Sequence, residues 1–196
     1  MRESKFRDPA WRRSALVLAG TILSALLLVL VVRAATAGAI LRRTEDTRQA
    51  VMVSVAPSDT TSFSQLPYDP SIVDDMYAAW QGESLAGYCV EVTADGFGGP
   101  MKLMVGVSAQ GSVTGVAILS HSETPGLGDS VDETAFLEQF PGLSGTVRIG
   151  SGANAVEAIS GATESSRAVA QGVSQALAAV AAYGAEGGAA REEGEN

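Results

Sequence analysis

The N-terminal part of the chain is dominated by one unbroken run of apolar residues. Residues 14–32 read SALVLAGTILSALLLVLVV and contain no charged side chain. A helix rises about 1.5 Å per residue, so this run reaches roughly 28 Å, close to the ~30 Å hydrocarbon core of a bilayer. The pattern predicts a transmembrane helix over residues 14–32, preceded by a basic segment, residues 1–13.

Beyond this run, apolar and polar residues alternate in several short stretches, which is the pattern of half-buried β-strands. Gly-rich turns separate some of these stretches, as is typical of antiparallel neighbours. The pattern predicts strands over residues 88–93, 101–108, 113–120, 146–149 and 155–159.

Three other stretches have helical character. Residues 71–80 and 132–140 are short helix candidates, and residues 162–182 carry apolar side chains at helical spacing. The expected fold class is α+β: a single N-terminal transmembrane helix, followed by an antiparallel sheet on which helices pack.

The remaining stretches separate these elements into domains. Residues 33–65 are polar and rich in Thr, Ser and Ala, and are predicted to be a juxtamembrane spacer, partly helical around residues 40–51. Residues 66–183 are expected to hold the folded domain. Residues 184–196, rich in Gly, Ala and Glu, are expected to form a disordered tail.

The charge is divided unevenly along the chain. Residues 1–43 hold eight Lys or Arg against two acids, whereas the rest of the chain holds five against twenty. The basic residues before the apolar run favour a cytoplasmic N-terminus by the positive-inside rule, which places the acidic domain outside the cytoplasm. An acidic domain also argues against nucleic acid as a partner, because phosphate backbones are held mainly by clustered Lys and Arg.

The apolar run has a second interpretation, as the core of a signal peptide. Ala35-Thr36-Ala37 follows it and resembles a cleavage site. However, the core of a signal peptide is typically 7–15 residues long, shorter than this run. We therefore favour an uncleaved anchor in the cell membrane.

The sequence holds one cysteine, Cys89, and one histidine, His121. These are too few for a zinc or iron–sulfur cage, which needs several such ligands. A redox role would therefore require an organic cofactor or a group held by another subunit. The position of Cys89 in a predicted strand indicates an inert core residue.

Three blocks between the predicted elements carry candidate chemistry. Residues 95–102 (DGFGGPMK) and 121–130 (HSETPGLGDS) permit tight turns with exposed backbone amides, although ordinary hairpin and surface turns explain them as well. Residues 160–163 (SGAT) stand where the last helix is predicted to begin. Ser160 is a candidate N-cap there, and the unpaired amides of a helix start also suit a phosphate. Both interpretations fit the spacing.

The three blocks occur together and in order, as GFGGPMKLMVGV (96–107), HSETPGLGD (121–129) and ISGAT (159–163). With the single anchor, the chain resembles the G subunit of the Rnf complex, a membrane-bound, ion-translocating ferredoxin:NAD oxidoreductase. It also resembles the related C subunit of the sodium-pumping NADH:quinone oxidoreductase. Both are members of the FMN-binding domain family, and the resemblance covers roughly residues 84–182 in detail.

The resemblance implies FMN attached covalently to Thr163 as a phosphoester, by a flavin transferase that takes FMN from FAD. Ser165 and Ser166 are nearby hydroxyls, but they follow the motif. Where the family pattern has Asp, this chain has Glu157, which keeps the charge for transferase recognition and adds a methylene. Further cofactor contacts are implied for Ser160, Gly161, Ala162, Glu123, Thr124, Pro125, Gly126, Leu127 and Gly128.

The function implied by the resemblance is that of an electron-transfer subunit in a redox-driven ion translocase, dependent on other membrane subunits. A subunit of the sodium-pumping type and a free-standing FMN carrier are redox alternatives. A non-redox, membrane-anchored assembly module, with the SGAT run as a helix cap only, is an alternative of another class. A cofactor-free hydrolase would need His121 as the base for Ser160 or Thr163, and is the weakest of the four.

Overall fold

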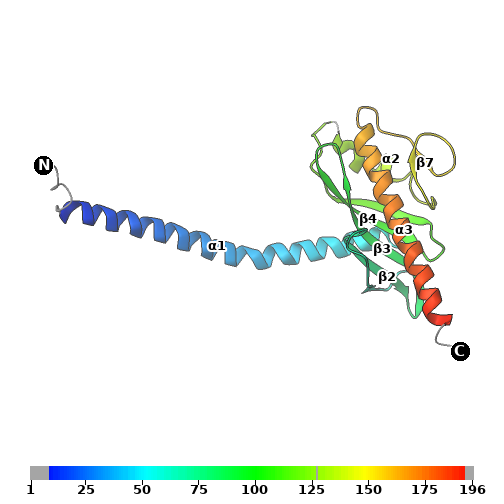
Figure 1. Cartoon of the computed structure of the whole chain (residues 1–196), viewed down its shortest axis with the longest axis horizontal. Helices are drawn as coiled ribbons and strands as arrows, with labels where there is room; N and C mark the ends of the chain where they lie inside the picture. The colour runs from blue at the N-terminus through cyan, green and yellow to red at the C-terminus, as the bar shows by residue number, and fades with distance from the viewer. Residues whose placement is uncertain (1–8, 127, 193–196) are drawn as a thin grey trace. The chain divides into compact units, whose positions relative to one another are not determined.

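The computed structural model describes residues 9–126 and 128–192 of the chain (Figure 1). The chain divides into two units, with the boundary between Thr47 and Arg48. The first unit is helical, and the second holds the sheet with the helices packed on it.

Helix α1 (Pro9–Val55) contains the predicted membrane span. Residues Ser14–Val31 are long and apolar enough to cross a membrane by length and composition, and their side chains are exposed. The helix is longer than the sequence pattern predicts, because it continues through the first part of the expected spacer. Ala and Arg recur in that part, and both are strong helix formers. The basic segment 1–13 lies largely outside the described residues.

Five antiparallel strands form the sheet of the second unit, in the order β1-β2-β3-β4-β5. The predicted strands over 101–108 and 113–120 are confirmed as β4 and β5, and the one over 88–93 is the centre of β3. The strands are β1 (Ser62–Gln65), β2 (Asp75–Gln81), β3 (Ser84–Asp95), β4 (Pro100–Ser108) and β5 (Val113–Ser120).

The helix predicted over residues 71–80 is wrong, because most of this stretch is strand β2. Its residues pair with β3, with Tyr77 opposite Cys89, and Met76, Ala78 and Ala79 are buried. Hydrogen bonding to β1 and β3 and burial of these side chains outweigh the weak helical preference of this stretch.

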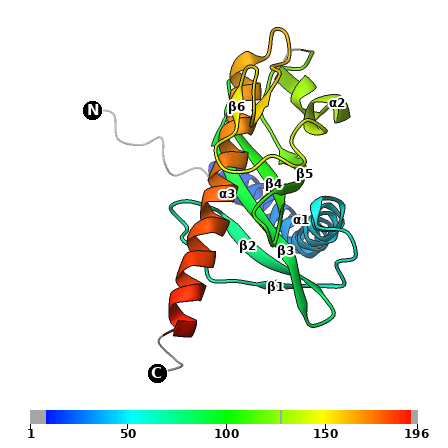
Figure 2. The ribbon, with the colours of Figure 1, turned by 90° about the vertical axis from the view of Figure 1, so that its right-hand side faces the viewer.

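Helix α3 (Thr163–Glu192) covers one face of the sheet (Figure 2). Its residues Val169 and Val173 are fully buried in a core shared with Val92 and Leu103. Each such side chain contributes about 1.5–3 kcal/mol on burial. A Cβ at Gly172 would lie 2.4 Å from Leu103 Cδ1, so α3 approaches the sheet closely at this glycine.

The last turns of α1, which belong to the second unit, pack on the opposite face of the sheet. Met52 and Val55 are buried there against Cys89 and Met104. Thr114 Oγ1 donates a 2.6 Å hydrogen bond to the carbonyl oxygen of Val55. The sheet is therefore covered on both faces.

Arg48, at the start of this unit, joins two buried carboxylates. Its Nε donates a 2.9 Å hydrogen bond to Glu91 Oε2, and its Nη2 lies 3.2 Å from Asp75 Oδ2. Burial alone lowers the pKa of Arg48, but the hydrogen bond and charge of Glu91, with Tyr77 and Asp75, raise it above its ordinary value. The guanidinium therefore stays charged between the two carboxylates, and Lys102 Nζ, 3.1 Å from Glu91 Oε1, supplies a second cation.

Short elements connect β5 to α3. They are the 3₁₀ helix η1 (Gly128–Asp132), the single helical turn α2 (Thr134–Leu137), and the strands β6 (Arg148–Ile149) and β7 (Ala155–Val156). The helix expected over 132–140 is thus shorter than predicted. The two late strands have two residues each and pair in parallel, separately from the antiparallel sheet.

The C-terminal end also differs from the expectation for residues 184–196. Helix α3 continues to Glu192, because Ala and Glu favour helix strongly enough to offset the glycines in this stretch. Residues 193–196 lie outside the described residues.

Candidate functional site

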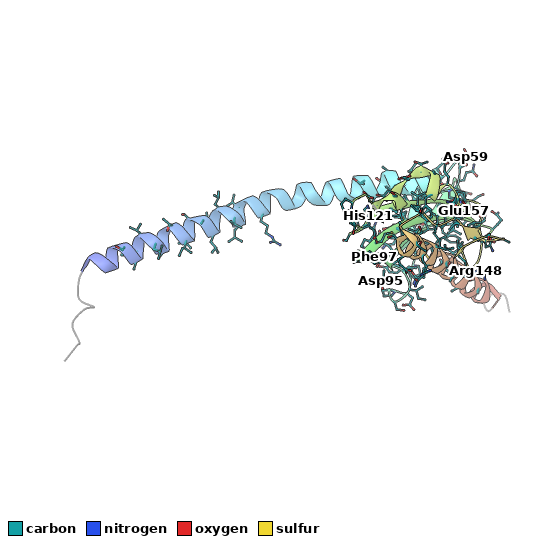
Figure 3. The ribbon with its side chains drawn as sticks, turned by 90° about the horizontal axis from the view of Figure 1, so that it is seen from above. Asp59, Asp95, Phe97, His121, Arg148 and Glu157 are labelled. Atoms are coloured by element: carbon teal, nitrogen blue, oxygen red, sulfur yellow. The ribbon has the colours of Figure 1, made fainter. Side chains whose placement is uncertain are left out.

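The structure brings the three blocks of the sequence together around one cavity. The β3–β4 loop, the segment after β5 and the start of α3 meet there, and Figure 3 shows Phe97 and His121 on the same side of the folded unit. Phe97 is 71% exposed at the cavity. The cavity has a volume of about 230 Å³ and is lined by Phe97, Glu123, Thr124, Gly128, Gly161, Ala162, Thr163, Glu164 and Ser165.

Glu123 joins the first two blocks to the first turn of α3 through its carboxylate. The residue is only 6% exposed, and its Oε2 accepts hydrogen bonds from Ser165 Oγ at 2.9 Å and from Gly98 N–H at 3.2 Å. Its Oε1 has no hydrogen-bond partner among the residues that the structure describes. A buried carboxylate with one unsatisfied oxygen is unfavourable by itself, and such groups concentrate at functional sites.

The glycines of the first two blocks make room for this carboxylate. A Cβ at Gly96 would lie 2.1 Å from Glu123 Oε1, and one at Gly128 would lie 2.5 Å from Glu123 Oε2. At Gly98, a Cβ would lie 2.2 Å from the carbonyl oxygen of Ser122. The close approach of two loops therefore explains these glycines.

His121 holds the backbone of Glu123 in place. Its Nδ1 accepts a 3.2 Å hydrogen bond from Glu123 N–H, which leaves the ring proton on Nε2. That Nε2 lies 3.1 Å from Asp132 Oδ2 and donates to it. His121 makes no contact with Ser160 or Thr163 in the described hydrogen-bond network, so the arrangement does not favour a hydrolase.

Helix α3 begins at Thr163 with unpaired amides. The first hydrogen bond of the helix runs from Ser166 N–H to the carbonyl oxygen of Ala162, at 2.9 Å. The amides of Thr163, Glu164 and Ser165 find no acceptor within the described part of the chain. Such a helix start carries a partial positive charge and suits an anion, in particular a phosphate.

Ser160, the candidate N-cap, does not cap the helix, because α3 begins at Thr163 and the N-cap position falls on Ala162. Ser166 stabilises the turn instead: its Oγ accepts from Ile159 N–H at 3.1 Å and donates to the Ala162 carbonyl at 2.8 Å. Gly161 has a φ of 83°, a left-handed value that favours glycine at this position.

The hydroxyls near the start of α3 differ in accessibility. Thr163 is exposed, whereas Ser165 and Ser166 are buried and hydrogen-bonded. Of these three, only Thr163 offers its oxygen to a reagent from solution. Glu157 is exposed a few residues upstream, on the approach to the same turn.

Only part of the loop over residues 123–128, which is predicted to flank the cofactor, lines the cavity. Thr124 and Gly128 line the cavity, and Pro125 and Gly126 are exposed beyond them. Asp129 Oδ1 accepts a 2.9 Å hydrogen bond from Gly126 N–H and holds the loop in its turn. Leu127 lies outside the described residues.

Metal and thiol chemistry receive no support at this cavity. Within residues 9–126 and 128–192, no three His, Cys, Asp or Glu side chains are grouped to hold a metal ion. Cys89 is buried against the end of α1, and burial raises the pKa of its thiol to about 12.

Comparison with known proteins agrees with the positions of these blocks. Residues 96–178 match the FMN-binding domain family. The chain is 35% identical over 113 residues to the G subunit of the proton-translocating ferredoxin:NAD(+) oxidoreductase complex of Clostridium ljungdahlii, covering 56% of this chain and 61% of that protein. It is 33% identical over 153 residues to the G subunit of the ion-translocating oxidoreductase complex of Cereibacter sphaeroides, covering 70% of this chain and 69% of that protein.

A solved structure is also similar to the chain. The crystal structure of Shewanella oneidensis NqrC matches with 21% sequence identity and a TM-score of 0.48, over 64% of this chain and 66% of that one. From the identity and coverage of the Cereibacter sphaeroides relative, together with the matched FMN-binding domain, we conclude that the chain belongs to the family of G subunits of ion-translocating oxidoreductase complexes.

Proposed function

We propose that this chain is the electron-transfer subunit of a membrane-bound, ion-translocating ferredoxin:NAD oxidoreductase complex of the Rnf type. In this proposal, FMN is attached covalently to Thr163 through a phosphoester. The names of its relatives and the matched FMN-binding domain support the redox role. The attachment and its position are inferred from the motif and the site.

One observation carries the proposal: the cavity joins the three blocks, with an exposed Thr163 hydroxyl at a helix start that has unpaired amides. A phosphoester on that hydroxyl would lie against the amides of residues 163–165 and the partial positive charge of the helix. The residues present therefore fit the phosphate end of a flavin nucleotide.

The other lining residues fit the rest of such a cofactor. Gly161 and Ala162 add no bulky side chain at the attachment turn, and Ser160 is exposed beside it. Residues 123–128 would flank the cofactor on one side, and the exposed ring of Phe97 gives an apolar surface on the other. The bound flavin would supply one- and two-electron chemistry, while the chain orients it and shields one side from water.

The proposed electron relay requires protein partners, because this chain would hold only the flavin. Electrons would come from, and pass to, other membrane subunits of the complex. The helix over residues 14–32 would anchor the subunit in the cell membrane, with its N-terminus cytoplasmic and the FMN domain outside the cytoplasm. A flavin transferase would bind transiently to attach the cofactor. The subunit would thus act as an electron relay within a redox-driven translocase.

The test is mass spectrometry on the full chain, purified from membranes of a host with an active flavin transferase. We expect added FMN mass on the peptide that contains Thr163 in the wild type. The Thr163→Ala variant should lack this mass, whereas the Ser151→Ala control, at an exposed position outside the three blocks, should keep it. An unmodified Thr163 peptide, from cells that flavinylate another protein, would contradict covalent attachment.

A further inference from the structure

We propose that Gln139 is a positioning residue for cofactor attachment, because it fixes the segment upstream of Thr163 in the conformation that the modifying enzyme binds. This inference rests on the proposed attachment of FMN to Thr163. It assigns a role to a side chain that lies outside the three blocks and outside the cavity.

The side-chain amide of Gln139 hydrogen-bonds both backbone groups of Glu157. Glu157 N–H donates to Gln139 Oε1 at 2.7 Å, and Gln139 Nε2 donates to the Glu157 carbonyl at 3.4 Å. A primary amide can supply one acceptor and one donor in this way, much as a neighbouring strand would. Eighteen residues separate the two along the chain, so the contact is not a local turn.

Gln139 is itself held firmly in place. It directly precedes Phe140, which is fully buried and packs edge-on against Phe136 with ring centroids 5.4 Å apart. The backbone at residue 139 is therefore tied to the core, and the amide contacts transmit this fixed position to Glu157.

A second attachment point lies at the other end of the segment. Ser166 Oγ accepts from Ile159 N–H at 3.1 Å, and Ala162 N–H donates to the Ile159 carbonyl at 3.0 Å. The backbone is thus held at Glu157 and at Ile159, while the side chains of Glu157, Ser160 and Thr163 are exposed. The segment presents a carboxylate and the acceptor hydroxyl from one fixed turn.

This arrangement fits an enzyme that brings FAD to the turn. In the reaction, a bond forms between Thr163 Oγ1 and the FMN phosphorus, the phosphorus–oxygen bond of the pyrophosphate breaks, AMP leaves and the hydroxyl proton is released. A segment that is already ordered does not lose conformational freedom on binding, so a fixed turn binds more tightly than a mobile one. The exposed Glu157 carboxylate offers a charged hydrogen-bond acceptor for a cationic group on that enzyme.

The test measures the initial rate of FMN attachment to the purified full chain, in detergent, with a flavin transferase and FAD. We expect Gln139→Ala to lower kcat/KM for the protein substrate about 5- to 10-fold, which corresponds to the net free energy of about one hydrogen bond. The change should lie in KM, with kcat little changed. Gln139→Glu keeps the acceptor for Glu157 N–H but replaces the donor to the Glu157 carbonyl with a second oxygen, so its kcat/KM should lie between those of Gln139→Ala and the wild type. Glu138→Ala, at the exposed neighbouring position, is the matched control and should react at the wild-type rate.

The outcomes separate this inference from the proposed function. A Gln139→Ala variant that melts like the wild type, yet accepts FMN at the wild-type kcat/KM, would overturn the role of Gln139 alone. A loss in kcat without a change in KM would also contradict a positioning role. If the wild-type chain accepts no FMN at Thr163, the proposed attachment fails and this inference fails with it.

Discussion

Ser165 Oγ donates a 2.9 Å hydrogen bond to Glu123 Oε2, although 42 residues separate the two along the chain. Both side chains are buried, and this contact ties the loop after β5 to the first turn of α3. The neighbouring Thr163 is exposed on the same turn. The position of the proposed attachment residue therefore depends on a carboxylate in a different block of the sequence.

Replacing Ser165 by Ala should destabilise the folded domain, because the buried Glu123 carboxylate loses one of its two donors. We expect a loss of about 1–3 kcal/mol in the free energy of unfolding, the usual cost of an unpaired buried acceptor. Urea denaturation of the full chain in detergent measures it. Ser151→Ala is the control, since Ser151 is exposed and should change stability by less than about 0.5 kcal/mol. Equal stability of the two variants would contradict the importance of the contact.

Gly98 should not tolerate a side chain. A Cβ there would lie 2.2 Å from the Ser122 carbonyl oxygen and 2.9 Å from Glu123 Cα, both backbone atoms that move only with the loop. We expect Gly98→Ala to cost about 1–3 kcal/mol in stability, as overpacked sites do. Thermal unfolding followed by circular dichroism is the measurement. Gly184→Ala is the control: it has open space around its Cβ and lies in α3, so it should raise stability slightly.

Much of the fold follows from local patterns in the sequence. Alternation located β4 and β5, and helical spacing located α3, because in these elements the local pattern agrees with the core that they face. Strand β2 was missed because its burial depends on pairing with β3 and not on its own alternation. The strands predicted over 146–149 and 155–159 are present as β6 and β7, but they are shorter than predicted, and alternation over so few residues could not show that they pair in parallel.

The candidate site was predictable as three separate blocks but not as one structure. The sequence places Gly98 and Glu123 in two different loops and Ser165 in the last helix, and only the folded chain brings them within hydrogen-bonding distance. No sequence motif indicates the contact between Gln139 and Glu157, because Gln139 binds the backbone of Glu157 and not its side chain. Thr163 as the attachment residue stays a prediction, supported by its exposure.

Arg48 should be important for the stability of the second unit. Its side chain is 23% exposed and lies between Glu91 and Asp75, both nearly buried. Arg48→Met would leave both carboxylates without their shared cation, and we expect a loss of about 2–4 kcal/mol. Chemical denaturation at neutral pH tests this.

Two controls make the Arg48 prediction specific. Arg167→Met removes an exposed ion pair with Glu164 and should cost less than about 0.5 kcal/mol. In a Glu91→Gln background, Arg48→Met should lower the free energy of unfolding clearly less than in the wild type. In that background only Asp75 loses its cation, because residue 91 no longer carries a charge. Additive effects of the two changes would show that Arg48 does not act through Glu91.

Cys89 should make stability fall at alkaline pH. Burial raises the pKa of its thiol in the folded chain to about 12, from a reference value of 9.0. Between these two values the unfolded chain loses the thiol proton while the folded chain keeps it. Unfolding is then favoured as the pH rises, by about 1.4 kcal/mol for each pH unit above the unfolded pKa.

Comparison of the wild type with Cys89→Ala isolates this effect from the other groups that titrate in the same range. The variant loses some packing against Met52 and Met104 and should be less stable at pH 8. Between pH 8 and pH 10, the wild type should lose about 1.4 kcal/mol more than the variant, as measured by urea denaturation at both values. Parallel losses in the two proteins would mean that the thiol is reached by water in the folded state, contrary to its position beneath the end of α1.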